Sequence, residues 1–159
     1  MNEQVQAELK KIFNSRFSTS ESTRANYARG EDTYDPILSK AVVFPETNEE
    51  VSKILSLCNQ HKIPVVPFGT GTSLEGNVVG NDKGITISLE KMNKILDVNT
   101  EDFDCRVQAC VTKEQLNEYL REDGVFFPID PGANAAIGGM ASTSASGTMA
   151  VKYGTMKTA

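Results

Sequence analysis

The chain has 159 residues, of which 39% are hydrophobic and 23% are charged, the composition of an ordinary globular protein. The formal net charge is −5 and no run of lysines and arginines occurs, so the sequence gives no reason to expect nucleic acid or an anionic lipid surface as a partner. No apolar stretch approaches the roughly 20 residues that a membrane-spanning helix needs, and the polar N-terminus does not resemble a secretory signal peptide.

The cysteine pattern indicates reduced thiols. There are three cysteines, Cys58, Cys105 and Cys110, and an odd number without a signal peptide predicts a cytosolic type of compartment. Cys105 and Cys110 are five positions apart in a strand-like run, so they would face opposite sides of a sheet and are poor partners for a disulfide or a metal. Each cysteine is predicted to be a small buried hydrophobic residue.

The first half of the chain predicts a parallel βαβ unit. Residues 3–14 place their apolar side chains on one helical face, and a polar, irregular segment follows as far as Pro36. Short buried strands are predicted at 41–44 and 63–68. The helix between them would begin with a capping box formed by Thr47 and Glu50. Two strands joined by a helix would run parallel with a right-handed crossover.

The second half of the chain alternates strands with a short helix. A strand is predicted at 84–89, and the segments 95–98 and 105–111 would pair as a hairpin. Another helix is predicted to begin with the capping box of Thr112 and Gln115 and to end at Gly124. A low-charge run of small residues follows at 132–150.

The stretch "PFGTGTSLEG", residues 67–76, has the chemistry of a phosphate-binding loop. It has no lysine, which excludes the P-loop of nucleotide hydrolases. Gly69 and Gly71 supply half of a Rossmann turn, but Leu74 occupies the third glycine position and the residues that follow do not have a helical pattern. Glycine amides and hydroxyl side chains can still bind an anion without a cation. A simple glycine-rich surface turn is the alternative that this stretch leaves open.

Two motifs together carry a family resemblance. "PVVPFGTGTSLEG" and "DPGANAAIGGMASTSASGTMAVKYGTM" resemble the FAD-linked oxidase family, whose flavin domain is the type shared by vanillyl-alcohol oxidase and p-cresol methylhydroxylase. The resemblance covers about residues 25–159 and is strongest to flavin D-lactate dehydrogenases, with the D subunit of glycolate oxidase as a near relative. The ending from Ser146 to Met156 favours the lactate branch.

The resemblance implies an α+β fold: a two-lobed FAD-binding domain of the p-cresol methylhydroxylase type with FAD extended between the lobes. The expected division is a lead-in of N-terminal helix and irregular chain at 1–36, a first lobe at 37–111, and the start of an incomplete second lobe at 112–159. Non-covalent FAD is expected, because Thr72 stands where some relatives attach the cofactor through a histidine. The residues implied to bind the pyrophosphate are Pro67, Phe68, Gly69, Thr70, Gly71, Thr72 and Ser73, and those implied to lie along the flavin are Pro131, Gly132, Gly138, Gly139, Thr143, Ser144 and Gly147.

The implied activity is hydride transfer to FAD from a D-2-hydroxy acid, with D-lactate the first expected substrate and glycolate the next. In the family, the catalytic base and any metal lie mainly on a C-terminal cap domain, so no catalytic or metal-binding residue is predicted in this chain. His61 is expected to be a solvated histidine at a helix end. The isolated chain is therefore expected to be an inactive N-terminal part that binds FAD weakly and can self-associate through an exposed sheet edge.

Two other functions stay open on the sequence alone. The chain could be an FAD- or nucleotide-binding module without catalytic activity, or a phosphate-binding structural domain unrelated to flavin. The electron acceptor is not encoded here. A cytoplasmic location is expected, with a location peripheral to a membrane as the family alternative for the full-length enzyme.

Overall fold

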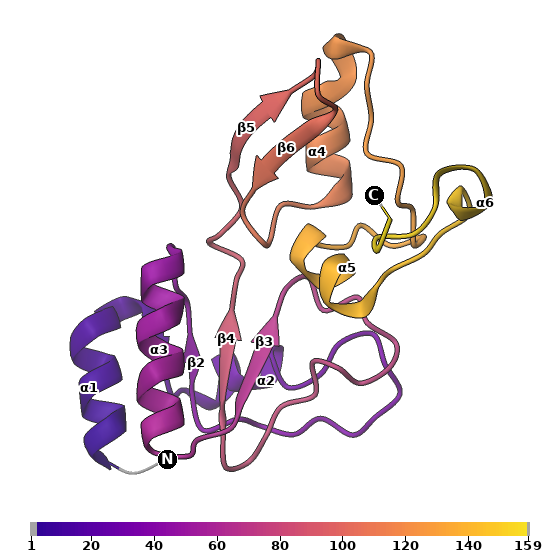
Figure 1. Ribbon diagram of the computed structural model, residues 1–159. Helices are drawn as coiled ribbons and strands as arrows, with labels where there is room; N and C mark the ends of the chain where they lie inside the picture. Colours follow the sequence, from indigo (N-terminus) through magenta and orange to yellow (C-terminus); the bar gives the residue numbers. More distant parts are fainter. Residues whose placement is uncertain (1–2, 159) are drawn as a thin grey trace. The chain divides into compact units, whose positions relative to one another are not determined.

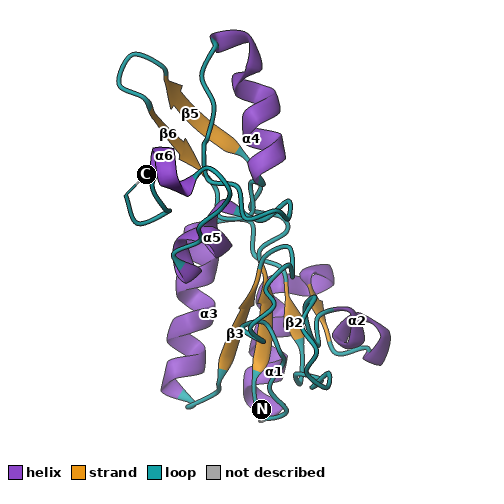
Figure 2. Cartoon of the chain, turned by 90° about the vertical axis from the view of Figure 1, so that its right-hand side faces the viewer, coloured by secondary structure: helices purple, strands orange, loops and turns teal. Residues whose placement is uncertain are grey.

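The computed structural model describes residues 3–158 and shows a mixed α+β fold, as expected. The chain divides into two compact units, residues 1–91 and 92–159, and each is described here by itself. Figures 1 and 2 label most of the helices and strands of both units.

The first unit is built on a mixed four-stranded sheet with the order β1-β2-β4-β3. β1 pairs antiparallel with β2, whereas β2 and β3 both pair parallel with β4. The predicted parallel relation of the two strands that flank the helix is confirmed, but β4 lies between them. The bounds of these strands are β1 (Phe17–Ser18), β2 (Val42–Val43), β3 (Val65–Phe68) and β4 (Ile85–Ser88).

Helices α1 (Glu3–Phe13) and α3 (Asn48–Gln60) supply the apolar core of the first unit (Figure 1). Their buried side chains form one cluster with Ile85 and Ile87, which are two positions apart on β4 and therefore face the same side of the sheet. Full burial of such an aliphatic side chain stabilises the fold by about 1.5–3 kcal/mol. The members contributed by the two helices are Val5, Leu9, Phe13, Ile54, Leu57 and Cys58.

The segment expected to be irregular contains short regular elements. A 3₁₀ turn η1 (Asn14–Arg16), the strand β1 and the helix α2 (Glu21–Asn26) all lie within it. The Ser20 side chain caps α2 by accepting a hydrogen bond from the Thr23 N–H at 3.3 Å. These elements are too short and too polar to give a periodic apolar signal, which explains why the sequence pattern misses them.

The second unit begins with the predicted hairpin. β5 (Ile95–Asn99) and β6 (Asp104–Val107) pair antiparallel, and their apolar side chains pack with Val111, Leu116 and Leu120 at α4. This hairpin belongs to the expected first lobe at 37–111, and in the structure it packs against α4. The division into FAD-binding lobes stays a prediction. The remaining elements are α4 (Lys113–Leu120), η2 (Arg121–Asp123), α5 (Ile137–Thr143) and α6 (Ala150–Tyr153).

The predicted helix starts are confirmed as N-caps. The Thr47 Oγ1 accepts from the Glu50 N–H at 3.3 Å, and the Thr112 Oγ1 accepts from the Gln115 N–H at 3.2 Å. The predicted end of the second helix region is confirmed as well, because Gly124 takes the left-handed conformation with φ of 71°.

The cysteines differ from one another in burial. Cys58 and Cys110 are buried, as predicted, and burial raises the pKa of the Cys58 thiol. The prediction for Cys105 was wrong, because this side chain is exposed. It lies near the tip of the hairpin, where the β6 residues 104–106 are all exposed.

None of the described helices is both long enough and apolar enough to cross a lipid bilayer.

Candidate functional site

The glycine loop, defined as residues 69–80, leaves the sheet at the carboxyl end of β3. Phe68 is the last residue of β3 and pairs with Ser88 at the same end of the parallel strand β4. The Leu89 N–H donates to the Phe68 carbonyl oxygen at 2.9 Å, which fixes the point where the loop begins. Ligands of open parallel sheets bind at this edge, outside the carboxyl ends of the strands.

Gly71 gives the loop a shape that would strain any residue with a side chain. Its φ is +75°, in the left-handed region, and a Cβ at this position would lie 2.8 Å from Cζ of the Phe68 ring. The Gly71 carbonyl oxygen accepts a hydrogen bond from the Glu31 N–H at 2.9 Å. The loop therefore curls closely over the Phe68 ring and is tied to a distant segment of the chain.

The loop presents several main-chain donors that have no acceptor in the part of the chain that the structure describes. No described residue accepts a hydrogen bond from the N–H groups of Gly69, Gly71, Thr72 or Ser73. The hydroxyls of Thr70 and Thr72 lie 3.3 Å apart at the same place. A run of such N–H and O–H donors matches the oxygens of a phosphate or pyrophosphate, so this donor set fits the FAD pyrophosphate.

The described chain contains no helix between Gly69 and Gly84, so the loop does not open a Rossmann helix. The buried Ser88 Oγ, at the same sheet edge, has no hydrogen-bond partner in the described part of the chain. Ser73 is held from within the loop, because its Oγ accepts from the Asn77 side-chain amide at 2.9 Å. Pro67 and Thr70 are exposed, whereas Phe68 is buried.

Tyr27 packs against Phe68, the last residue of β3. Its ring packs edge-on against Phe68 with centroids 5.1 Å apart and against Phe44 at 5.5 Å. Its hydroxyl donates to the Glu90 carboxylate. Tyr27 lies just after α2 in the polar segment, and no pattern in the sequence indicates this contact.

In the second unit, the predicted flavin-side glycines lie in a helix. Gly138 and Gly139 belong to α5, a helix that the sequence analysis did not predict. The Gly138 N–H donates to the Ala109 carbonyl oxygen at 2.8 Å, and a Cβ at Gly138 would lie 2.8 Å from the Cβ of Ala109. Gly139 is exposed and has open space where a Cβ would stand.

Thr143 and Ser144 form the exposed end of α5. The Thr143 Oγ1 donates to the Gly139 carbonyl oxygen at 3.0 Å. Ser144 is the C-cap and takes the left-handed conformation with φ of 51°. An exposed, hydroxyl-bearing helix end follows the open position at Gly139 on the same short helix.

Asp130 organises the remaining predicted residues of this unit. Its carboxylate accepts from the Lys113 ammonium at 2.7 Å and from the Gly132 N–H at 3.3 Å, and these contacts, chiefly that of Lys113, lower its pKa. Gly147 packs directly against the Asp130 carbonyl, so a side chain there would collide with the backbone. Pro131 and Gly132 are exposed, and Gly132 has φ of +89°.

The structure thus gathers the predicted residues into two groups. The pyrophosphate set, from Pro67 to Ser73, lies at one sheet edge of the first unit. The flavin-side set, from Pro131 to Gly147, lies on and around α5 in the second unit. Their assignment to FAD stays a prediction.

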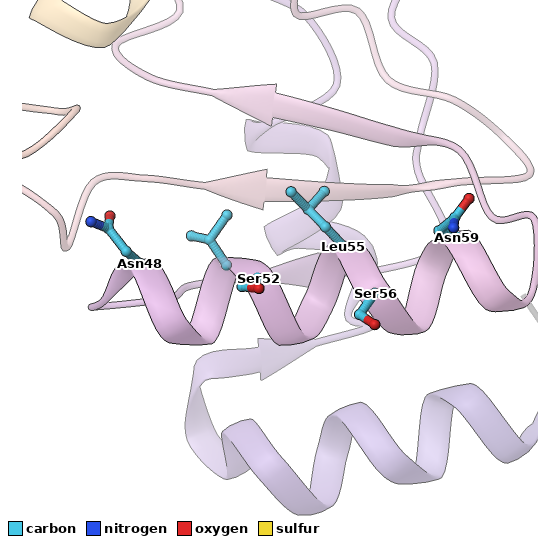
Figure 3. A pocket seen from close by; sticks show the side chains of 6 residues that line it. Asn48, Ser52, Leu55, Ser56 and Asn59 are labelled. Atoms are coloured by element: carbon cyan, nitrogen blue, oxygen red, sulfur yellow. The ribbon is translucent and has the colours of Figure 1, made fainter.

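A hollow of about 560 Å³ lies elsewhere, along the outer side of α3 (Figure 3). It contains none of the predicted cofactor-binding residues, and none of its lining side chains is charged. His61 caps the C-terminal end of the same helix. Among residues 3–158, no three His, Cys, Asp or Glu side chains gather as metal ligands. The residues that line the hollow on α3 are Asn48, Val51, Ser52, Leu55, Ser56 and Asn59.

Comparison with known sequences identifies the family of the chain. A family model described as FAD binding domain matches residues 39–159. The chain is 46% identical over 140 residues to the probable mitochondrial D-lactate dehydrogenase of Danio rerio, covering 88% of this chain and 28% of that protein. It is 40% identical over 153 residues to the mitochondrial D-lactate dehydrogenase (cytochrome) of Arabidopsis thaliana, covering 95% and 27%. It is 30% identical over 140 residues to glycolate oxidase subunit GlcD of Bacillus subtilis, covering 87% and 30%.

Solved structures show the same fold. Alkyldihydroxyacetonephosphate synthase superposes with a TM-score of 0.89 at 22% identity, over 99% of this chain and 32% of that one. p-Cresol methylhydroxylase superposes with a TM-score of 0.63 at 21% identity, over 81% and 26%. The chain spans 27–28% of the length of the first two sequence relatives. The expected family is confirmed: the chain belongs to the FAD binding domain family, and its homologues include D-lactate dehydrogenases and a glycolate oxidase subunit.

Proposed function

We propose that this chain is the FAD-binding part of a flavin-dependent dehydrogenase that oxidises a D-2-hydroxy acid to the 2-oxo acid. D-lactate is the first expected substrate and glycolate the next, which follows from the names of the relatives. The observation that carries the proposal is that the N–H groups of Gly69, Gly71, Thr72 and Ser73, at the carboxyl edge of the sheet, have no acceptor among the described residues.

The pyrophosphate would be bound by main-chain groups rather than by cations. Within residues 3–158, the N–H groups of Gly69, Gly71, Thr72 and Ser73 have no acceptor, and the Thr70 and Thr72 hydroxyls belong to the same loop. Amides in fixed orientations bind an anion without the reorganisation that flexible lysines would need. This explains how a loop without lysine or arginine can hold a doubly negative group.

The flavin side would be contacted by the small residues of the second unit. Gly139 has open space on the exposed side of α5, and the Thr143 and Ser144 hydroxyls follow on the same helix. Pro131, Gly132, Gly138 and Gly147 would shape this surface through the backbone, because Gly138 and Gly147 are packed tightly against Ala109 and Asp130. Small side chains let a flat ring approach the backbone closely.

FAD would be bound without a covalent link. Thr72 stands where the family resemblance places the histidine of covalently attached members, and a hydroxyl cannot form that bond. FAD supplies the acceptor for the hydride when it is bound. We propose that the catalytic base and the groups that hold the substrate carboxylate belong to a cap domain outside these residues.

The test is flavin uptake followed by reduction. The intact protein is expected to bind one FAD per chain, and addition of D-lactate without oxygen is expected to bleach the visible flavin absorption. L-lactate is the matched control and is expected to leave the absorption unchanged. A protein that takes up no FAD would contradict the cofactor assignment. A protein that binds FAD but is bleached by no D-2-hydroxy acid would instead be a binding module without this activity.

A further inference from the structure

The glycine loop is held by a segment that lies far from it in the sequence. Residues 28–37, which we call the strap, run beside the glycine loop (Figure 1). The Gly80 N–H donates to the Ala28 carbonyl oxygen at 2.9 Å, and the Glu31 N–H donates to the Gly71 carbonyl oxygen at 2.9 Å. The strap therefore contacts the loop near its beginning and at its end.

The packing between strap and loop is close enough to require glycine on both sides. A Cβ at Gly30 would collide with the Gly71 carbonyl oxygen. A Cβ at Gly76 would lie 2.7 Å from atoms of the Tyr34 ring. Because these contacts are so close, a change in the conformation of the turn around Glu31 would move Gly71 as well.

Asp32 holds that turn. The residue is only 7% exposed, and its two carboxylate oxygens accept from the Gly30 and Tyr34 N–H groups, each at 3.0 Å. Asp32 forms no ion pair with another residue of the described chain. A buried carboxylate is costly unless it is hydrogen-bonded, and here both partners are backbone groups of the strap on either side of Glu31.

The peptide bond between Gly71 and Thr72 links the strap to the direction of the Thr72 N–H. The Gly71 carbonyl and the Thr72 N–H belong to one planar trans peptide, in which the two groups point in opposite directions. Because Glu31 holds the Gly71 oxygen towards the strap, the Thr72 N–H must point away from the strap. That N–H is one of the donors with no acceptor in the described chain.

We propose that Asp32 is a positioning residue for FAD: acting through Glu31 and Gly71, it aims the Thr72 N–H at the cofactor pyrophosphate. This inference rests on the proposed function. The strap precedes residue 39, where the match to the family model begins, so that match does not include Asp32.

The test compares three variants of the intact protein. Asp32→Ala removes both acceptors, and Asp32→Asn keeps the shape of the side chain with a single acceptor oxygen in case the alanine variant does not fold. Asp35→Asn is the control, because it makes the same change of charge on an exposed strap side chain. Without FAD, amide hydrogen exchange is expected to show faster exchange at Glu31 in both Asp32 variants. Exchange at Thr86, whose N–H is bonded to Ala41 within the sheet, is expected to stay unchanged.

Ligand binding provides the second readout. The dissociation constant for FAD is expected to rise about tenfold in Asp32→Ala, the factor for one lost hydrogen bond to a charged group. Binding of riboflavin, which has no phosphate, is expected to stay the same. An equal loss for both ligands, or FAD binding and Glu31 exchange like those of the wild type, would overturn the positioning role alone. Absence of FAD binding by the wild type would overturn the proposed function and this inference with it.

Discussion

Arg16 and Glu50 form a bidentate ion pair in which Nη1 and Nη2 of Arg16 each lie 2.6 Å from a carboxylate oxygen of Glu50. Arg16 also donates to the Phe44 carbonyl oxygen at 3.1 Å, and Glu50 also accepts from the Glu46 N–H at 2.7 Å. The pair joins the turn after α1 to the first turn of α3, and thereby connects the two helices that cover the sheet. Hydrogen bonding from Arg16 is the main reason that the pKa of Glu50 is lowered to about 2.

This pair predicts a pH-dependent contribution to stability. The pKa of Glu50 is lower in the folded state than its ordinary value of 4.5, so the contribution is complete above pH 4.5 and is lost as the pH falls towards 2. Glu50→Gln is expected to lower the free energy of unfolding by about 1 kcal/mol at pH 7, since the pair is partly exposed. The difference between wild type and variant is expected to shrink between pH 4.5 and pH 2 in urea titrations.

Glu8→Gln is the matched control, because Glu8 is exposed on α1. Its difference from the wild type is expected to stay near zero over the same pH range. A difference for Glu50→Gln that stays constant down to pH 2 would show that the pair does not set this pH dependence.

Gly71→Val is expected to abolish flavin uptake. A β-branched residue at φ of +75° costs about 1–2 kcal/mol, and its Cβ would in addition press on the Phe68 ring. The loop would have to open, and its N–H donors would then no longer point together at the proposed pyrophosphate site. Flavin content per chain after purification is expected to fall by at least about tenfold.

Gly124→Ala is the control for this variant. Gly124 also has a positive φ, of 71°, but a Cβ there would meet nothing within 4 Å. It is therefore expected to lower stability slightly and to retain the flavin. If Gly71→Val retains as much flavin as Gly124→Ala, the glycine loop is only a turn.

The sequence could predict the elements whose signals are local. The apolar face of α1, the caps at Thr47 and Thr112 and the stop at Gly124 each depend on residues within a few positions of one another, and the structure contains all of them. The place of the glycine loop directly after a strand was also predictable, because its glycines follow a short apolar run, whereas its role in binding phosphate stays a prediction.

The parts that were missed depend on contacts between distant residues. The strap meets the loop through Glu31 and Gly71, which are far apart in the chain, so no window of sequence contains both. The insertion of β4 between β2 and β3 is likewise a matter of topology rather than periodicity. Cys105 was wrongly predicted as buried because that prediction used the general tendency of cysteine to be buried, which takes no account of its place near the exposed tip of the hairpin.

The absence of a covalent link can be tested by denaturation. Because Thr72 offers no imidazole, acid or heat precipitation of the flavin-loaded protein is expected to release all of the flavin into the supernatant. Absorption of the supernatant and of the redissolved pellet gives the two fractions. Flavin that stays with the pellet after washing would mean that another side chain of the protein forms the bond.

The isolated chain of 159 residues is expected to show no turnover. The proposed site supplies donors for the cofactor but neither a base nor a cationic group for a substrate carboxylate. Dye reduction with D-lactate and added FAD is expected to equal the background measured without chain. A rate that rises in proportion to the amount of chain would place catalytic groups within these residues.

Gly138 and Gly139 are neighbours in α5 but are expected to respond in opposite ways to alanine. A Cβ at Gly138 would lie 2.8 Å from the side chain and the carbonyl oxygen of Ala109, so Gly138→Ala is expected to lower the free energy of unfolding by about 1–3 kcal/mol. A Cβ at Gly139 meets nothing, so Gly139→Ala is expected to raise it by about 0.5–1 kcal/mol through helix propensity.

The Gly139→Ala variant also distinguishes an effect on stability from an effect on cofactor binding. If Gly139 lies against the flavin, Gly139→Ala is expected to weaken FAD binding although the protein becomes more stable, because the added methyl group takes up space that the ring needs. Thermal unfolding without FAD and fluorescence titration with FAD measure the two effects on one sample. Because the stability gain cannot itself weaken binding, a more stable Gly139→Ala protein with unchanged FAD affinity would remove Gly139 from the proposed flavin surface. The proposed pyrophosphate loop would be unaffected by that result.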